Sequence, residues 1–419
     1  MEKYKVRKNL NLSTVEGTFW AIMYGAGESY ISALAVFLGF STFQISFLNS
    51  FPEFIGSCFQ LLSSTIKNKF KSIKRFVAII SLVQSLMWLL IIICIIYSPN
   101  YTTILIWACL YFSIASVIGP AWTAWMGYFV PNRLRSRYFG KRNRIIGFIS
   151  FISTFIAGYI LDIFENNMIN GFFIIFTIAF VGRLISAFYL NRKYNFDGEE
   201  NIDLLDYLYS FKGLILNKNR SFYYILFNSY ISFSIMFFGP LFSIYILREM
   251  NLGMIIYTTN MTLWQIANFS SSNYFGKLCD KIGDYNVLKL STYVIVFLPI
   301  LWIALYYLND EFRIVATFLV SILAGICFSA YSLSSFNMIY KISKKEEVIH
   351  FTAVGAFLRG FSILIGGILA GLIVESIYLR NIAIKLNSIM NLELIPIHLS
   401  MIISVLLRFL SIPILKKIK

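Results

Sequence analysis

Long apolar runs separated by short polar connections dominate the 419-residue chain. A helix needs roughly 20 consecutive apolar residues to cross the hydrocarbon core of a bilayer, whereas membrane β-strands are shorter and alternate in polarity. Because lipid offers the backbone no hydrogen-bonding partners, runs of this length are expected to be helical. The pattern predicts an all-α membrane protein with twelve transmembrane helices, near residues 14–40, 43–66, 74–97, 102–129, 144–164, 169–190, 221–247, 253–275, 286–308, 311–340, 350–378 and 394–415.

The composition agrees with this pattern, since 58% of the residues are hydrophobic and only 13% are charged. A soluble chain of this size could not bury so much apolar surface, so a soluble enzyme and a disordered chain are excluded. The net charge of +16 would suggest nucleic acid in a soluble protein, but cytoplasmic loops of membrane proteins also collect Lys and Arg. The five cysteines and two histidines show no metal-ligand spacing, so we expect neither a metal nor a cofactor, and no enzyme activity.

The Lys and Arg residues also predict the topology. Of the 36, 29 fall in the termini and in alternate connections, whereas the opposite set of connections holds only four, Arg248, Arg313, Arg380 and Lys385. Because positive loops stay on the cytoplasmic side, both termini are expected in the cytoplasm of a multi-pass cell-membrane protein.

The longest cytoplasmic connection, residues 191–220, divides the chain into two six-helix bundles, 1–190 and 221–419. Its apolar residues recur at helical spacing, which predicts a short amphipathic helix on the inner membrane surface, with a soluble linker as the alternative. The bundles are related in sequence, because a shift of 213 residues pairs Gly147 with Gly360 and Asp162 with Glu375. Two pseudo-symmetric bundles that rock about a central site are typical of transporters.

Two loops carry more specific motifs. After the eighth span, residues 276–283 read G-x-L-x-D-x-x-G, with Gly276, Asp280 and Gly283 at the defined positions. After the fourth span, residues 120–143 contain PAWTAWM, VP and RYFGKRN. With twelve spans and duplicated halves, the sequence resembles the major facilitator superfamily, in particular a prokaryotic branch with a RYFGKRN-type loop after helix four. The matching loop after the second span keeps its basic residues but lacks the Gly and Asp.

The resemblance implies a secondary active transporter, a permease of the symporter or antiporter type that moves a small organic solute by alternating access. It implies a monomer whose partners are a small-molecule substrate and membrane lipids, and it leaves proton coupling open. A uniporter without ion coupling and a transporter-like sensor or receptor are the alternatives. Few charges and many aromatic residues in the expected cavity favour neutral or amphipathic compounds over phosphates or dicarboxylates.

The same resemblance implies a cytoplasmic gate. An acidic residue such as Asp280 can pair with a basic side chain or a helix N-terminus when the inner mouth closes. The gate network would comprise the motif residues and the arginines after the fourth span, namely Gly276, Asp280, Gly283, Arg135, Arg137, Arg142 and Arg144. Anchoring to anionic lipid headgroups is the alternative for the arginines.

Ionisable residues inside spans are costly and usually functional, and Glu28, Glu53 and Arg359 are such residues. The resemblance places their spans around the central cavity, so they are predicted to bind substrate or a proton. Glu28, flanked by Gly25 and Gly27, is the predicted main protonation site.

Polar residues in the second, seventh, eighth and tenth predicted spans complete the predicted site: Asn49, Gln60, Asn228, Tyr230, Trp264, Gln265, Asn268 and Asn337. Ordinary contacts between helices are the alternative for all of the predicted site residues. Arg183 and Arg408 lie close to cytoplasmic helix ends and are expected to snorkel toward the membrane surface.

Overall fold

The computed structural model describes residues 2–130, 135–195, 219–342, 348–376, 381 and 394–418, which form helices and short connections without a strand. Contacts divide the chain into two compact units. Unit 1 comprises Met1–Leu38 and Ile55–Asp206, and unit 2 comprises Gly39–Phe54 and Tyr207–Lys419. Residues 196–218, which hold most of the predicted 191–220 linker helix, lie outside the described residues.

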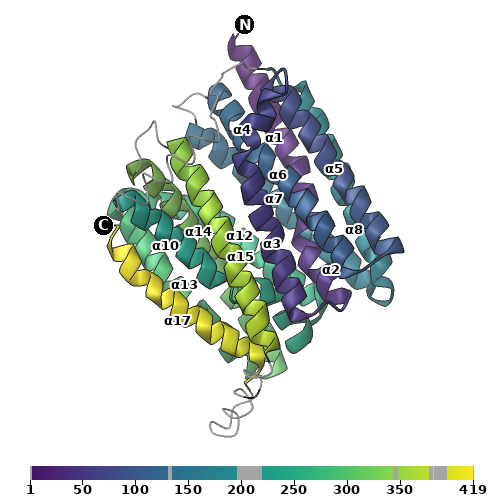
Figure 1. Ribbon diagram of the computed structural model, residues 1–419, viewed down its shortest axis with the longest axis vertical. Helices are drawn as coiled ribbons and strands as arrows, with labels where there is room; N and C mark the ends of the chain where they lie inside the picture. Colours follow the sequence, from purple (N-terminus) through teal and green to yellow (C-terminus); the bar gives the residue numbers. More distant parts are fainter. Residues whose placement is uncertain are drawn as a thin grey trace. The chain divides into compact units, whose positions relative to one another are not determined.

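Unit 1 is built from long helices and short connecting pieces. In this unit α1 packs against α7 and α8, α5 packs against α6 and α8, and the short α4 packs against α6 (Figure 1). The elements of this half of the chain are α1 (Glu2–Ala26), η1 (Glu28–Tyr30), α2 (Ile31–Phe37), α3 (Thr42–Leu61, shared with unit 2), α4 (Ser63–Asn68), α5 (Ile73–Tyr97), α6 (Tyr101–Phe129), α7 (Arg135–Ile163), η3 (Glu165–Asn167) and α8 (Met168–Arg192).

Local chemistry explains where these helices begin and how closely they pack. The side chains of Ser72 and Asn100 accept hydrogen bonds from the first free amides of α5 and α6, as N-cap residues do. Gly25 lets α1 approach α7, because a Cβ there would lie 2.7 Å from the carbonyl oxygen of Ser150. The buried core between α5 and α6 includes Phe76 and Trp125.

The first predicted span, 14–40, is not one continuous helix. α1 ends at Ala26, a 3₁₀ turn runs over Glu28–Tyr30, and α2 continues from Ile31. Gly27 at the break packs so closely on Trp88 that a Cβ would collide with the indole ring. Breaks in spanning helices occur where backbone lines a cavity or a binding site in a transporter.

Unit 2 repeats the arrangement of long helices. In this unit α12 packs against α14, α13 against α14 and α17, and α10 against α15 and α17. Its elements, besides the first part of α3, are α10 (Arg220–Ile235), η4 (Gly239–Leu241), α11 (Phe242–Ile244), η5 (Tyr245–Glu249, a π-helix), α12 (Gly253–Ile282), α13 (Asp284–Tyr306), α14 (Asp310–Ile342), α15 (Val348–Glu375) and α17 (Pro396–Lys416).

The seventh predicted span, 221–247, is interrupted like the first. α10 ends at Ile235, and the 3₁₀ turn Gly239–Leu241 follows it. Shifting the Glu28–Tyr30 turn by 211 residues places it on Gly239–Leu241, close to the 213-residue shift that relates the fifth and eleventh spans. The duplication seen in the sequence therefore extends to the position of a helix break.

Nine helices among the described residues are long and apolar enough to cross a membrane; they lie in α5, α6, α7, α8, the α10–η5 segment, α13, α14, α15 and α17. α1, α3 and α12 have 25, 20 and 30 residues but are more polar, and the twelve-span arrangement remains a prediction. The outer face of α5 carries Ile79, Leu82, Leu86 and Ile93 at helical spacing, each 42–51% exposed. Such an apolar stripe on the surface fits contact with lipid.

Candidate substrate and proton site

Glu28 lies in the 3₁₀ turn that breaks the first span and is half-buried. Its Oε1 accepts a hydrogen bond of 2.5 Å from the hydroxyl of Tyr111 on α6. No residue of the described part of the chain forms an ion pair with this carboxylate. Glu28 is therefore held in place by a neutral donor, and its charge state can change without breaking a direct ion pair.

The Tyr111 hydroxyl continues into a polar network within unit 1. It accepts a hydrogen bond from Nε2 of Gln84 at 3.1 Å, and Oε1 of Gln84 accepts one from Nε of Arg183 at 2.7 Å. Arg183 also donates to Ser81 at 2.9 Å. Its side chain is only 4% exposed, so the snorkelling prediction for Arg183 was wrong. The position of Arg183 along α8 did not indicate the direction of its side chain, because the rotation of α8 points the guanidinium inward to α5.

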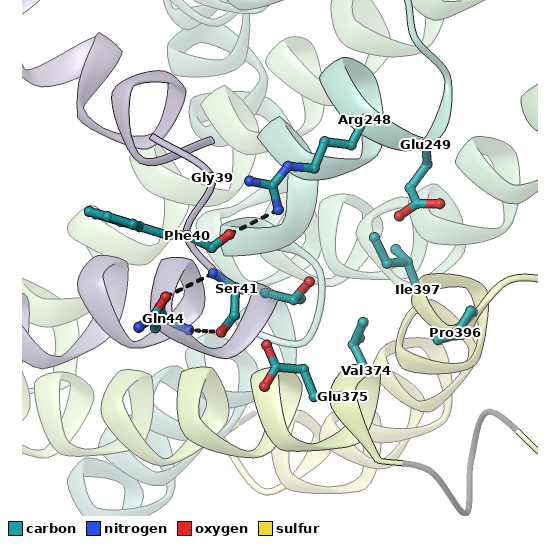
Figure 2. A pocket seen from close by; sticks show the side chains of 11 residues that line it. Gly39, Phe40, Ser41, Gln44, Arg248, Glu249, Val374, Glu375, Pro396 and Ile397 are labelled. Carbon is teal, nitrogen blue, oxygen red and sulfur yellow. Dashed lines mark hydrogen bonds between the residues drawn. The ribbon is translucent and has the colours of Figure 1, made fainter. Parts of the chain in front are cut away.

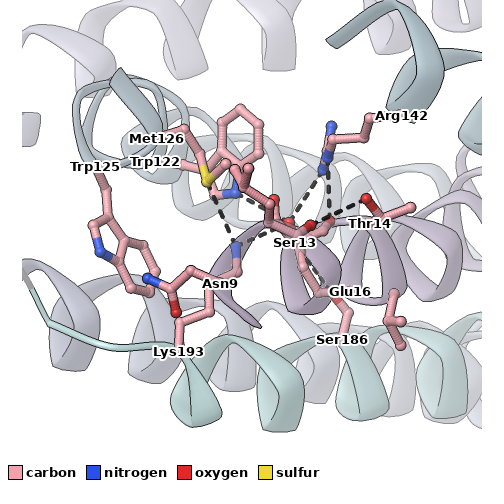
Figure 3. Close-up of polar contacts among 12 residues, drawn as sticks. Asn9, Ser13, Thr14, Glu16, Trp122, Trp125, Met126, Arg142, Ser186 and Lys193 are labelled. Carbon is pink, nitrogen blue, oxygen red and sulfur yellow. Dashed lines mark hydrogen bonds and ion pairs between the residues drawn. The ribbon is translucent and has the colours of Figure 1, made fainter. Parts of the chain in front are cut away.

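Glu16 forms a second ionic centre in unit 1 that the sequence analysis missed. Its carboxylate lies 3.1 Å from a guanidinium nitrogen of Arg142 and 3.5 Å from the ammonium of Lys193. Nε1 of Trp122 donates to the same carboxylate at 3.1 Å, and the Arg142 guanidinium stacks over the Trp122 ring (Figure 3). The available signal was a glutamate inside the predicted span 14–40. Because Glu16 lies near the end of that span, it was not included among the predicted intramembrane residues.

The predicted gate arginines differ in their surroundings. Arg142 is tied to Glu16 and to the carbonyl of Ser13 within unit 1. Arg144 is exposed, and the side chains of Arg135 and Arg137, in the first turn of α7, are outside the described set. The role of these arginines as gate residues stays a prediction.

In unit 2, Glu53 and Arg359 are electrostatic partners. The positive charge of Arg359, on α15, acts on the Glu53 carboxylate of α3 and on the hydroxyl of Tyr331, on α14. Tyr331 donates to Oδ1 of Asn228 at 2.7 Å. Three residues of the predicted site are thus brought into one neighbourhood, and aromatic rings line it, because Phe54 lies 5.9 Å from Phe361.

The remaining predicted site residues are more dispersed. Trp264 is 37% exposed and packs edge-on against Phe328, whereas Asn268 lies where the α12 backbone nearly touches Gly325. Asn49 donates to the carbonyl of Ile45 in its own helix. The others are half-buried on α3, α10 and α12: Gln60, Tyr230 and Gln265. Glu28 and Gln60 belong to unit 1 and the rest to unit 2.

Asn337 contacts the G-x-L-x-D-x-x-G loop instead. Its Nδ2 donates to Asp284 at 2.8 Å, and the Lys341 ammonium forms an ion pair with the same carboxylate. Asp284 is buried at the start of α13, after Gly283 with its φ of +85°, whereas the motif residue Asp280 is exposed. Both aspartates line a pocket of about 480 Å³ with Cys279. Burial, followed by the hydrogen bond to Asp284, raises the pKa of the Cys279 thiol to about 12.

A larger pocket of about 800 Å³ opens in unit 2, lined by the 39–44 segment, Arg248, Glu249 and the end of α15 (Figure 2). Arg248 donates to the carbonyl of Phe40 at 2.9 Å. The Glu375 carboxylate accepts from the amide of Phe43 at 2.7 Å, in the first turn of α3. The 39–44 segment is therefore held within unit 2 through the backbone carbonyl of Phe40 and the backbone amide of Phe43.

The sequence profile of the Major Facilitator Superfamily matches residues 18–366, well over half of the chain. The chain belongs to the major facilitator superfamily. This confirms the family resemblance drawn from the loops, and it makes the protein a multi-pass membrane transport protein and not an enzyme. A comparison with curated protein sequences found no match.

Solved transporter structures share the fold. The crystal structure of nucleoside transporter NupG has 16% sequence identity and a TM-score of 0.69, covering 97% of this chain and 99% of that one. A bacterial homologue of the iron transporter ferroportin in an inward-facing state has 11% identity and a TM-score of 0.70, with 98% of both chains covered. A D-xylose-proton symporter has 12% identity and a TM-score of 0.67, with 99% of both covered. At these identities the similarity shows the fold alone.

Proposed function

We propose that this facilitator is a proton-coupled secondary transporter that moves a small organic solute across the membrane by alternating access. The observation that carries the proposal is the position of Glu28 at the break in the first span, held by one tyrosine hydroxyl and by no direct cation. A carboxylate in such a position can bind and release a proton while the backbone around it changes shape. Carboxylates inside membrane segments commonly serve as proton carriers.

The substrate would bind near Arg359 and Glu53. Their opposite charges, the Tyr331 hydroxyl and the phenylalanine rings beside them offer both hydrogen bonds and apolar contact. Such a mixture suits a small organic molecule with polar groups. The similar structures are those of a nucleoside transporter, a D-xylose-proton symporter and a bacterial homologue of an iron transporter, so they do not select one substrate class for this chain.

The cytoplasmic gate would lie where α12 ends and α13 begins. Asp280 is the motif residue in the last turn of α12, and the buried carboxylate of Asp284, paired with the exposed ammonium of Lys341, ties the start of α13 to α14. The transporter that we propose is a monomer with this gate and with both termini in the cytoplasm.

The proposal is tested with purified protein in liposomes that contain a pH-sensitive dye. Nucleosides and D-xylose are the first probes, followed by any compound that raises the melting temperature of the protein. We expect an inward proton gradient to drive accumulation by the parent protein, and Glu28→Gln to exchange solute without accumulation. Glu165→Gln, which alters an exposed glutamate of η3, is the matched control.

The alternatives give different results in the same assay. A uniporter would equilibrate the solute in both the parent and Glu28→Gln, with no response to the gradient. A sensor would bind solute and gain thermal stability but move none. Accumulation by Glu28→Gln against its gradient would contradict the proposed role of Glu28.

A further inference from the structure

The two ionic centres of unit 1 are joined by an unbroken series of side-chain contacts. On one side, Glu28 is linked to Arg183 through the Tyr111 hydroxyl and the Gln84 amide. On the other side, Arg183 donates to the Ser186 hydroxyl at 3.2 Å, which lies 3.4 Å from Oε2 of Glu16. One side chain, that of Ser186, thus lies between Arg183 and Glu16. Two side chains, those of Gln84 and Tyr111, lie between Arg183 and Glu28.

The Glu16 end is itself saturated with cations. Arg142 and Lys193 both lie against Oε1 of Glu16, while Oε2 faces Ser186 (Figure 3). Glu16 is 3% exposed and Lys193 is 1% exposed, so water screens these charges weakly. Two carboxylates are therefore shared among three cations in the interior of one unit.

We propose that Arg183 is a positioning residue that couples the charge of Glu28 to the ion cluster of Glu16, Arg142 and Lys193. This proposal rests on the proposed function for its meaning in transport, but the coupling itself is a property of the network. Glu16 and Glu28 are twelve residues apart along the first span, which corresponds to about 18 Å of helix.

The coupling is electrostatic and does not pass a proton. A guanidinium keeps its proton in proteins, so a proton cannot move from Glu28 to Glu16 through Arg183. When Glu28 becomes neutral, Arg183 loses one of its two negative partners and is attracted more strongly to Glu16. Arg142 and Lys193 then compete with Arg183 for the same carboxylate and are held less tightly.

Other groups that face this network are tyrosines. Tyr24 on α1 and Tyr111 on α6 face Glu28, and Tyr138 on α7 faces Glu16 and Arg142. Their hydroxyls remain neutral near pH 7, so the five charged residues carry the response. Because Arg142 lies in the first part of α7, just before the predicted span 144–164, its release would be felt at the cytoplasmic end predicted by the topology.

The test reads the charge state of one end at the other. Protein labelled with 5-fluorotryptophan gives a ¹⁹F NMR signal for each of its tryptophans, assigned by single Trp→Phe variants. Trp88 packs on Tyr111 and reports on the Glu28 end, Trp122 contacts Glu16 and Arg142, and Trp302 in unit 2 is the control. Spectra are recorded in nanodiscs at a fixed pH for parent protein and Glu28→Gln, each with and without Arg183→Gln.

We expect Glu28→Gln to move both the Trp88 and Trp122 signals and to leave Trp302 in place. With Arg183→Gln present, Glu28→Gln should still move Trp88 but should displace Trp122 by less than half as much. Arg183→Lys keeps the charge and should restore most of the Trp122 displacement. An unchanged Trp122 signal in Glu28→Gln, or an equal displacement with Gln at residue 183, would overturn the coupling.

Two measurements protect the test. Where Arg183→Gln does not fold, Ser186→Ala removes the hydroxyl between Arg183 and Glu16 and should reduce the Trp122 displacement; an undiminished displacement counts against the proposal. Because Glu28→Gln imitates the neutral carboxylate, the spectra do not depend on transport. Intact coupling without proton-driven accumulation would contradict the proposed function only, and the reverse result would contradict the coupling only.

Discussion

Arg183 and Arg408 occupy matching places in the two halves of this facilitator. Arg183 lies nine residues before the end of α8 and Arg408 eight residues before the end of α17, and both are buried, at 4% and 3% exposure. Their partners differ. Arg183 has three side-chain acceptors and two carboxylates nearby, whereas Arg408 donates to the carbonyl of Ile295 and its Nε has no partner in the described structure.

The difference extends beyond the two arginines. The interior of unit 1 around Arg183 is ionic, whereas the interior of unit 2 around Tyr245 and His398 is lined by aromatic rings. There the Tyr245 hydroxyl donates to the carbonyl of Trp302 and lies 3.1 Å from Nε2 of His398. Both units thus bury an arginine in their last long helix, but among the described residues only Arg183 has acidic partners. We therefore expect the proposed charge coupling to reside in unit 1.

The largest expected difference is in stability. Arg183→Met removes the buried cation that lies between Glu16 and Glu28 and leaves Oε1 of Gln84 and the Ser81 hydroxyl without their donor. Removing one partner of a buried ionic network costs about 3–5 kcal/mol. Arg408→Met removes a buried cation that has no charged partner in the described residues, and should be neutral or stabilising. Unfolding in mixed detergent micelles, followed by circular dichroism, measures both variants. Equal losses of stability for the two would remove the distinction between the halves.

Both arginines also show what the sequence could not provide. Snorkelling was predicted for Arg408 as for Arg183, and it was wrong for both, because position along a helix gives depth but not rotation. α17 turns Arg408 toward α13, and α8 turns Arg183 toward α5. The choice of face depends on partners from distant parts of the chain, which no local pattern contains.

Other features were visible in the sequence. Twelve apolar runs and two loop motifs led to the family, and Gly25, Gly27 and Glu28 marked the place where the first span breaks, although a continuous span was expected there. The G-x-L-x-D-x-x-G motif was identified through Asp280, but the buried, paired residue is Asp284 four positions later. A motif identifies a loop by the spacing of its residues, whereas burial depends on how α13 packs against α14.

The second prediction concerns the pH response of transport. Glu28→Gln should lower proton-driven accumulation at least about tenfold, a change that corresponds to about 1.4 kcal/mol, because the amide cannot take up or release a proton. His398→Gln, in the aromatic interior of unit 2, should retain the response, because its two ring nitrogens already contact Tyr245 and the amide of Ile395. Accumulation is measured in liposomes across a series of imposed gradients. A loss caused by His398→Gln alone would move the coupling site to unit 2.

The third prediction concerns the loop between α12 and α13. In a variant whose other cysteines are replaced, Cys279 should react slowly with a maleimide, because burial raises its pKa to about 12 and the thiolate is the reactive form. Lys341→Met removes a positive charge that lowers the pKa of the thiol, so it should slow the labelling further. Asp280→Asn removes a negative charge that raises this pKa, so it should speed the labelling slightly. Faster labelling of Lys341→Met than of the parent would contradict this electrostatic account and would mean that the ion pair with Asp284 limits access to the thiol.

The smallest expected effect compares Glu375 with Asp162, which the 213-residue shift pairs. Glu375 caps the first turn of α3 through the amide of Phe43, and an acidic cap near a helix N-terminus contributes about 1 kcal/mol. Asp162 is exposed near the end of α7, where the helix dipole does not favour a negative charge. Glu375→Gln should therefore lower stability by up to about 1 kcal/mol, and Asp162→Asn should leave it unchanged or raise it slightly. Unfolding at low and high salt separates the charge effect from the hydrogen bond, since added salt screens only the former. A salt-independent loss for both variants would mean that neither carboxylate acts through its charge. No loss for Glu375→Gln would mean that the 39–44 segment owes its attachment to Arg248 and not to Glu375.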